Sequence, residues 1–336
     1  MLNNKNILIT GGTGSFGQKF VEIVLKKFKP KKLIIFSRGE SKQSLMAEKF
    51  STNDYKCIRY FIGDVRDFDR LKIATRGIDI IIHAAAMKQV PASEYNPIEC
   101  IKTNIYGAQN LVLASIENNV KKVVALSTDK AVNPINLYGA SKLSSDKLII
   151  SANNLSAGKG PIFSVVRYGN VYGSTGSVVE LFEKLKNSNK PFPITNKSMT
   201  RFIISLDQGV MFVLRSLNMM KGGEIFLPKM PSIKIIDLAK AINQSKRISI
   251  IGIRPGEKIH ESMTTQDDNN LLIEFKNYFK HLPSYMQNAK EIKRYKIGEN
   301  GEIGNYVSSK FSYTSDKNKF LNIKEIRKFI INQKKK

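Results

Sequence analysis

The first half of the chain alternates short apolar runs with longer segments whose apolar residues recur at helical spacing. The runs are nearly continuous, as is typical of parallel strands that are covered by helices on both faces. Between the first two runs, Phe16, Phe20, Ile23 and Val24 fall on one helical face. This alternation predicts βαβ units with strands at residues 6–10, 32–37, 58–62, 79–83, 122–127 and 163–168.

After about residue 170 the pattern changes, and proline and glycine interrupt most segments. We therefore expect an α/β protein with a Rossmann-like, doubly wound parallel sheet and a smaller C-terminal substrate-binding lobe. The expected division is a nucleotide-binding domain over 1–170, to which a segment around 200–225 returns, and a lobe with a C-terminal tail over 171–336. A closing helix is expected from about Asn322, with Ile326 and Ile330 on its apolar face.

Composition narrows the class of protein. The chain has 336 residues, 42% of them hydrophobic, and 54 Lys and Arg against 28 Asp and Glu, a net charge of +26 that favours anionic partners. No apolar stretch approaches the roughly 18 residues of a membrane span, and no signal peptide is visible. Cys57 and Cys100 lack disulfide or metal-ligand spacing. We expect a cytoplasmic protein without a metal site and without a membrane partner.

A glycine-rich segment lies between the first predicted strand and the first predicted helix. It reads Thr-Gly-Gly-Thr-Gly-Ser-Phe-Gly over residues 10–17. Its glycines allow a tight turn, and the helix that follows presents free N–H groups to an anion. A plain strand–helix turn is the alternative, but the position at the start of a βαβ unit favours a dinucleotide diphosphate. The cofactor contacts expected here are Gly11, Thr13, Gly14, Ser15, Phe16 and Gly17.

The second predicted strand ends in Ser37 and Arg38, where an NAD-binding fold usually places an acidic residue. A hydroxyl and a guanidinium, with Lys42 one turn later, suit a ribose 2′-phosphate, which favours NADP over NAD. A solvated basic loop is the alternative. Asp64 and Val65 follow the third strand, where they are placed to contact the adenine ring.

Two further groups of residues suggest catalysis. Tyr138 and Lys142 are four residues apart, hence on one helical face. A phenol with a reference pKa near 10 needs an adjacent ammonium and a cationic nicotinamide ring to favour the phenolate. Thr128, Asp129 and Lys130 stand at the end of the fifth strand, the edge of a parallel sheet at which ligands bind. The alternative for Tyr138 and Lys142 is an ordinary pair of exposed residues on a helix. The alternative for Thr128 and Asp129 is a turn that their side chains stabilise by hydrogen bonds.

These motifs resemble a known family. The glycine loop, the Tyr138 and Lys142 pair and the Arg-Tyr-Gly-Asn segment at 167–170 are similar to extended short-chain dehydrogenase/reductases that act on nucleotide sugars. More narrowly, residues 128–130 resemble the inverting UDP-N-acetylglucosamine 4,6-dehydratases. Hexose dehydratases that retain the C5 configuration commonly carry Asp-Glu where this chain has Asp129 and Lys130. Supporting segments lie at 84–88, 133–140 and 253–258, and the resemblance runs from about Lys5 to Glu261.

The resemblance implies a reaction and an assignment of roles. C4 of the sugar is oxidised, the C6 hydroxyl leaves as water and C5 is inverted, which yields UDP-2-acetamido-2,6-dideoxy-β-L-arabino-hexos-4-ulose on the way to pseudaminic acid in surface glycosylation. Tyr138 takes the C4 hydroxyl proton, Lys130 the C5 proton, and Asp129 protonates the leaving hydroxyl, with Thr128 and Lys142 completing the catalytic set. Lys130 as a base requires a pKa lowered by burial or by cations such as Lys142, and Asp129 must carry a proton when it acts.

The resemblance also implies binding contacts and an assembly. NADP stays tightly bound and recycles, in a homo-oligomer. Ala84 and Ala86 are implied as cofactor contacts. The implied contacts with the UDP-sugar are Lys88, Asn170, Val178, Thr195 and Arg254. The alternative for Arg254 is a surface ion pair, and the alternative for Lys88 is a solvated side chain. His83 is expected to be a packed, hydrogen-bonded residue outside the chemistry.

Alternative functions remain open. A nucleotide-sugar 4-epimerase, or a dehydratase that also epimerises in a capsular deoxyamino-sugar pathway, would share the glycine loop and the Tyr138 and Lys142 pair. Asp129 and Lys130 favour the dehydratase over an epimerase, which needs neither an acid at C6 nor a base at C5. A basic nucleic-acid-binding protein is disfavoured, because the cations are scattered and no aromatic-basic recognition motif is present. We therefore expect no nucleic-acid partner.

Overall fold

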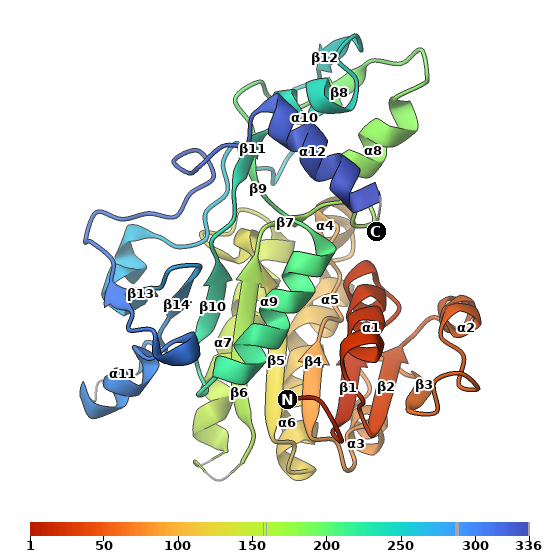
Figure 1. Ribbon diagram of the computed structural model, residues 1–336, viewed down its shortest axis with the longest axis vertical. Coiled ribbons are helices and arrows are strands. Elements are labelled where there is room, and N and C mark those ends of the chain that lie inside the picture. The colour runs from red at the N-terminus through yellow and green to blue at the C-terminus, as the bar shows by residue number, and fades with distance from the viewer. Residues whose placement is uncertain (157, 159, 286–288, 335–336) are drawn as a thin grey trace.

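The computed structural model describes residues 1–156, 158, 160–285 and 289–334, and these form a central ten-stranded sheet (Figure 1). Six parallel strands stand in the order β3-β2-β1-β4-β5-β6 on one side of it. Because β1 pairs with both β2 and β4, strand order reverses at β1. These strands are β1 (Asn6–Thr10), β2 (Lys32–Ser37), β3 (Ile58–Ile62), β4 (Ile80–His83), β5 (Lys122–Thr128) and β6 (Ile162–Tyr168).

The six strands predicted from the apolar runs are confirmed to within one residue at each end. The predicted fold class, an α/β protein with a Rossmann-like doubly wound parallel sheet, is confirmed as well. All residues of β1 and β2 except the first of each strand are buried, because helices cover both faces of these strands.

Helices form a layer on each face of the sheet. In Figure 1 α1 (Ser15–Lys27) packs beside α9 (Leu206–Met219) in front of the sheet, with α6 (Gly107–Glu117) and α7 (Leu137–Leu155) behind it. Phe20 and Val24 are fully buried, as the helical face predicted for α1 requires. The remaining helices of this half are α2 (Glu40–Lys49), α3 (Phe68–Ala74), α4 (Val90–Tyr95), α5 (Pro97–Ile101), the π-helical η1 (Lys102–Tyr106) and the 3-10 helix η2 (Asp129–Ala131).

The second half of the chain extends the sheet. β10 (Ile225–Pro228) pairs in parallel with β6, and β14 (Tyr278–His281) pairs antiparallel with β10. β13 (Leu272–Glu274) and β15 (Asn305–Tyr306) complete this edge. Also in this region are the helices η3 (Gln266–Leu271), α11 (Ala289–Tyr295) and η4 (Glu299–Gly301).

A smaller lobe stands above the carboxyl ends of the parallel strands (Figure 1). Its core is separate and includes Phe182 and Phe192, whose rings stack with centroids 4.6 Å apart. The predicted closing helix is confirmed as α12 (Ile323–Lys334), which packs on α10 (Ile235–Ile242) and buries Ile326 and Ile330. The other elements of the lobe are α8 (Val178–Leu185), β7 (Asn170–Val171), β8 (Phe192–Ile194), β9 (Thr200–Ile204), β11 (Ser232–Lys234) and β12 (Ile248–Ile250).

No helix within the described part of the chain has the length and apolar character needed to cross a membrane.

Candidate active site

A cavity of about 1560 Å³ lies where the carboxyl ends of the parallel strands meet the smaller lobe. The β1–α1 loop and the ends of β2 to β6 line one side, and residues from β8 and from the 254–258 loop line the other. Every site residue predicted from the sequence lines this cavity, except Asp129. The topology therefore brings together residues that are spread over most of the chain.

The glycine loop forms a tight turn at the start of α1. Gly11 has φ +65°, and a Cβ there would lie 2.9 Å from the Ala84 carbonyl oxygen, while a Cβ at Gly17 would lie 2.3 Å from the Gly12 carbonyl oxygen. Gly14 caps α1 without a side-chain hydrogen bond, and the first turn carries no acidic residue. The first amides of α1 thus remain open to an anion, which fits the diphosphate of a dinucleotide.

The end of β2 presents basic groups to the cavity. The Arg38 side chain is exposed, and its Nη1 lies 3.6 Å from Asp64 Oδ2. Arg66 Nε also donates a hydrogen bond to Asp64 Oδ2, at 2.9 Å. Burial acts to raise the pKa of Asp64, but the contacts with Arg66 and Arg38 outweigh it and hold the pKa below its ordinary value. Lys42 lies beside them, and the Ser37 hydroxyl accepts a hydrogen bond from a glutamine side chain at 3.0 Å.

The start of α7 packs directly against η2, and a glycine makes this close approach possible. The Asn136 side chain caps α7 by accepting a hydrogen bond from the Gly139 amide at 2.8 Å. A Cβ at Gly139 would lie only 2.2 Å from the Lys130 carbonyl oxygen. Because Gly139 has no side chain, α7 can place Tyr138 next to the residues that follow β5.

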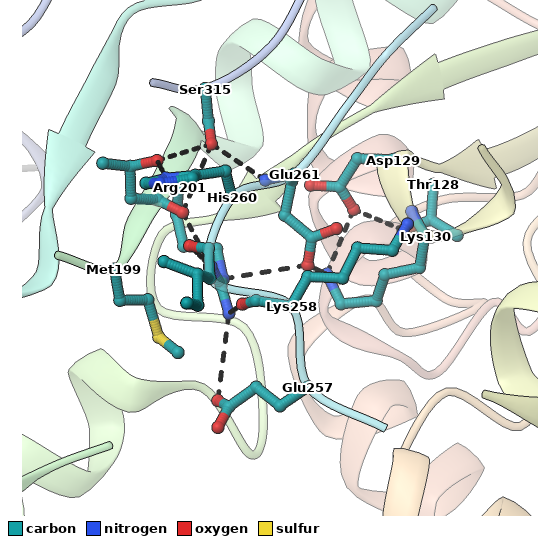
Figure 2. Close-up of polar contacts among 12 residues, drawn as sticks. Thr128, Asp129, Lys130, Met199, Arg201, Glu257, Lys258, His260, Glu261 and Ser315 are labelled. Carbon is teal, nitrogen blue, oxygen red and sulfur yellow. Dashed lines mark hydrogen bonds and ion pairs between the residues drawn. The ribbon is translucent and has the colours of Figure 1, made fainter. Parts of the chain in front are cut away.

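Lys130 is held by two carboxylates (Figure 2). Its Nζ lies 3.0 Å from Asp129 Oδ1 and 3.2 Å from Glu261 Oε1. Burial disfavours the ammonium, but the two negative charges outweigh burial and raise the pKa of Lys130 above its ordinary value. The expectation that burial or cations such as Lys142 lower this pKa is therefore wrong, because the carboxylates of Asp129 and Glu261 both lie within 3.2 Å of Nζ.

Asp129 lies behind Lys130 and not on the cavity wall. Its side chain is fully buried, and its Oδ1 accepts a hydrogen bond from the Thr128 hydroxyl at 2.9 Å. Its Oδ2 is buried with no hydrogen-bond partner among the described residues, 3.3 Å from where a Cβ at Gly169 would stand. Thr128, which lines the cavity, thus connects the buried Asp129 carboxylate to the cavity wall through this hydrogen bond.

Burial changes the ionisation of the other titratable groups here. It raises the pKa of Tyr138 to about 12, although the Lys130 charge and the Thr128 hydroxyl act in the opposite direction. Burial therefore outweighs the ammonium that we expected to favour the phenolate, and the largest cationic influence on Tyr138 is Lys130. Burial also lowers the pKa of Lys142, with Asp146 opposing it.

His83 is confirmed as a packed, hydrogen-bonded residue. Its Nδ1 lies 2.8 Å from Thr10 Oγ1, and the ring is 2% exposed. Burial, with a smaller contribution from the Lys142 charge, lowers its pKa to about 3.

The five residues expected to bind the sugar nucleotide all line the cavity, Lys88 from the segment after β4 and the other four from residues 170–254. Asn170 Oδ1 is buried and has no hydrogen-bond partner in the described ranges, so it is available to a ligand. The Thr195 hydroxyl donates to Met199 Sδ at 3.3 Å. Within the part of the chain that the structure describes, Arg254 makes no ion pair, contrary to the surface-pair alternative. Val178 begins α8, and the Lys88 ammonium is disfavoured by burial, which lowers its pKa.

The structure adds three charged residues that sequence reasoning did not assign to the site. Figure 2 shows Arg201, Lys258 and Glu261 grouped on one side of Lys130. Arg201 donates to the carbonyl oxygens of Ile259 and Lys258, and Lys258 Nζ donates to a backbone carbonyl of the η2 turn at 2.6 Å. Lys258 belongs to a segment that carries the resemblance, but no spacing connects Glu261 with Lys130.

Comparisons with known proteins cover nearly the whole chain. A family model described as "Polysaccharide biosynthesis protein" matches residues 7–283. The chain is 56% identical over 319 residues to the inverting UDP-N-acetylglucosamine 4,6-dehydratase of Campylobacter jejuni subsp. jejuni serotype O:23/36 (strain 81-176), a match that covers 95% of this chain and 94% of the relative. It is 40% identical over 339 residues to the UDP-glucose 4-epimerase of Rickettsia bellii (strain RML369-C), covering 99% and 97%. The solved structure of Pen from Bacillus thuringiensis superposes with a TM-score of 0.89 at 36% identity, over 99% of both chains.

Proposed function

The chain belongs to the polysaccharide biosynthesis protein family, and from that membership we propose that it catalyses the configuration-inverting 4,6-dehydration of UDP-N-acetylglucosamine. The main observation behind this proposal is that Lys130 and Asp129 lie together at the end of β5, next to Tyr138. The cavity beside them is also lined by the glycine loop. A 4,6-dehydration needs a base at C5 and an acid at C6, and these two side chains can supply both. The relative at 56% identity, named for this reaction, supports the proposal.

NADP is the proposed cofactor, with NAD as the alternative. The open amides at the start of α1 suit its diphosphate, and Arg38 and Lys42 suit a 2′-phosphate. Asp64, Val65, Ala84 and Ala86 complete the proposed contacts along the strand ends. When bound, NADP would supply reversible hydride transfer, for oxidation at C4 and reduction at C6, so that the reaction would have no net redox change.

Tyr138 is the proposed acceptor of the C4 hydroxyl proton. Its pKa of about 12 means that the phenol is the resting form, so the proton must leave the phenol before the residue can act as a base. Lys130 supplies the nearby positive charge that favours the phenolate, and Lys142 lies one helical turn along α7.

Lys130 and Asp129 are the proposed base at C5 and acid at C6. Lys130 lines the cavity and can reach a sugar carbon, whereas Asp129 is buried behind it. We propose that the Asp129 proton travels through the Thr128 hydroxyl, which is hydrogen-bonded to Asp129 Oδ1 and lines the cavity. Thr128 receives the proton from Asp129 and donates its own to the leaving C6 hydroxyl, which departs as water.

The smaller lobe is the proposed binding site for the UDP-sugar. Arg254 and Lys88 offer positive charge for a diphosphate or for a hydroxyl-rich ring, and Asn170 offers an unpaired amide oxygen. Thr195 and Val178 line the same wall. The proposed NADP-binding domain comprises residues 1–170 with the returning segment around 200–225, and its proposed cofactor contacts all lie between Gly11 and Lys142. Residues 171–336 mainly form the proposed substrate-binding lobe and the C-terminal tail.

The product is proposed to be UDP-2-acetamido-2,6-dideoxy-β-L-arabino-hexos-4-ulose, as the first intermediate toward pseudaminic acid in bacterial surface glycosylation. The similarity to the Campylobacter jejuni dehydratase supports this. A homo-oligomeric assembly and a cytoplasmic location stay predictions.

A 4-epimerase is the second candidate, because the Rickettsia bellii relative at 40% identity is named for that activity. The deciding experiment is to incubate the purified protein with UDP-N-acetylglucosamine in deuterated water, without added cofactor, and to follow the sugar by proton NMR. We expect loss of water, a new C6 methyl signal, deuterium at C5 and the couplings of an L-arabino ring. Inversion at C4 alone would identify an epimerase, and additional inversion at C3 would identify a dehydratase that also epimerises. No reaction, even with NADP⁺ supplied, would contradict the proposal.

A further inference from the structure

Glu261 is a buried carboxylate in direct contact with the proposed base. Its side chain is 2% exposed, and Oε1 lies 3.2 Å from Lys130 Nζ. The same oxygen lies 3.8 Å from Arg201 Nε. Its other oxygen, Oε2, is buried and has no hydrogen-bond partner in the part of the chain that the structure describes. A carboxylate buried to this degree requires compensation by positive charge, and Lys130 and Arg201 supply it.

The fold holds the Glu261 backbone in place through a segment near the C-terminus. The Glu261 amide donates to Ser315 Oγ at 2.9 Å, and the Ser315 amide donates to the Glu261 carbonyl oxygen at 2.8 Å. Ser315 Oγ also lies 2.7 Å from Thr200 Oγ1 on β9. These contacts hold the Glu261 main chain against Ser315, while burial and the contacts with Lys130 and Arg201 hold its carboxylate. The carboxylate is therefore preorganised next to Lys130 and is not a freely rotating surface group.

The two carboxylates around Lys130 cannot both act as its counter-ion throughout the proposed reaction. Asp129 must carry a proton in order to protonate the C6 hydroxyl, and in that form it has no charge with which to balance the Lys130 ammonium. That ammonium forms when Lys130 takes the C5 proton. Glu261 Oε1 makes a separate contact with Nζ, at 3.2 Å, in addition to the contact of Asp129 Oδ1 at 3.0 Å. Protonation of Asp129 therefore leaves the contact with Glu261 in place.

We propose that Glu261 is the permanent ion-pair partner of Lys130, a positioning residue that stabilises the Lys130 ammonium and leaves Asp129 free to carry the proton for the C6 hydroxyl. This inference rests on the proposed dehydration. The titratable and charged groups that influence Lys130 are Asp129, Glu261, Arg201, Lys258 and Tyr138. Of these, Asp129 and Glu261 are the two carboxyl groups, and Tyr138 rests as a neutral phenol. The proposed chemistry requires a proton on Asp129 and requires none on Glu261.

The test compares the wild type with Glu261→Gln, which keeps the shape of the side chain and removes its charge. The first readout needs no substrate: the rate at which a lysine-acylating reagent labels Lys130, followed by mass spectrometry from neutral to alkaline pH. Only the neutral amine reacts. Without Glu261 the neutral form becomes more abundant at neutral pH, and we expect labelling there to rise about tenfold for each unit by which the pKa falls.

The second readout is the pH profile of deuterium incorporation at C5 of the sugar. In the wild type we expect incorporation to increase with pH through the alkaline range, as Lys130 loses its proton. In Glu261→Gln this increase should move toward neutral pH and reach a lower plateau, because the less basic amine is a weaker proton acceptor. Glu261→Asp retains the charge but moves it away from Lys130 by one methylene. Its pH profile should therefore lie between those of the wild type and Glu261→Gln.

The matched control is Glu224→Gln, which removes another fully buried carboxylate, one that accepts a hydrogen bond from Ser164 at 2.9 Å in the core. It should leave both profiles unchanged. Profiles of Glu261→Gln that coincide with the wild type would overturn the inference. Should Glu261→Gln not fold, an unshifted labelling profile in Glu261→Asp would overturn it equally. A wild type that does not dehydrate the sugar would refute the proposed function. The labelling experiment needs no substrate, so it would still test the ion pair between Glu261 and Lys130.

Discussion

Two of the lysines in the cavity have pKa values that shift in opposite directions, although burial acts on both in the same way. The pKa of Lys142 is lowered, because burial outweighs the influence of Asp146. The pKa of Lys130 is raised, because Asp129 and Glu261 together outweigh burial. Lys142 is therefore the easier of the two to deprotonate, whereas Lys130 must lose its proton before it can act at C5.

Replacement of Lys130 by alanine tests its role as a base. We expect the Lys130→Ala variant to lose deuterium incorporation at C5 and dehydration by about 10²- to 10⁴-fold, the range typical of a general base. Binding of UDP-N-acetylglucosamine, measured by calorimetry, should persist. A variant that dehydrates at the normal rate would remove Lys130 from the mechanism.

The buried His83 should make the free energy of unfolding depend on pH. Its pKa is about 3 in the folded protein against an ordinary value of 6.5 for histidine, so the unfolded chain binds a proton between these values and the folded protein does not. The contribution of His83 is therefore fully present above about pH 6.5, and is lost as pH falls toward about 3, at up to about 1.4 kcal/mol per pH unit. Urea denaturation over this range should show a shallower decline in His83→Gln than in the wild type. Equal slopes would contradict the assignment.

At the scale of elements, the contact between α7 and η2 positions the catalytic groups. α7 begins at Leu137 with an Asn136 cap, which local sequence can specify. Its approach to η2 depends on Gly139, because any Cβ would overlap the Lys130 carbonyl oxygen. A helix start and a strand end that are adjacent in the chain thus become one rigid unit.

Alanine at Gly139 should disturb this unit. We expect Gly139→Ala to destabilise the fold by about 1–3 kcal/mol, the usual range for overpacking, and to lower kcat by moving Tyr138 away from Lys130. Thermal unfolding and steady-state kinetics measure the two effects. Gly209→Ala is the control: it lies within α9, a Cβ there meets nothing within 4 Å, and stability should rise by about 0.5–1 kcal/mol. Equal behaviour of both variants would show that the α7–η2 contact is unimportant.

At the scale of the whole molecule, the positive net charge and the cavity between the sheet and the lobe both favour an anionic ligand. The chain carries a net charge of +26, and the cavity that holds Lys88, Arg254 and Lys258 opens between the sheet and the lobe. A surface with this excess of positive charge attracts a nucleotide diphosphate from solution.

Ionic strength should therefore affect substrate capture more than chemistry. We expect KM for the UDP-sugar to rise several-fold from low to physiological salt, because screening shortens the range of attraction to about 8 Å, while kcat changes little. Initial rates at a series of sodium chloride concentrations measure this. A KM that is independent of salt would show that the net charge plays no part in binding.

The sequence by itself determined the order of strands and helices in the first half and the place of each motif at a strand end. The strands β1 to β6 could be predicted because continuous apolar runs and helical periodicity are local signals. The strands β13 to β15 near one edge of the sheet could not, because they are two to four residues long and carry no comparable pattern. Their pairing depends on neighbours elsewhere in the chain.

Tertiary structure alone decided the electrostatics of the site. The positions of Tyr138, Lys142 and Lys130 followed from motifs, but the burial of Asp129 behind Lys130 did not. Nor did the pairing of Lys130 with Glu261, whose charge adds to that of Asp129 so that the Lys130 pKa is raised and not lowered as expected. The physical reason is that a pKa depends on charges and burial within a few ångströms in space, and the segment that carries Glu261 reaches Lys130 only once the chain has folded.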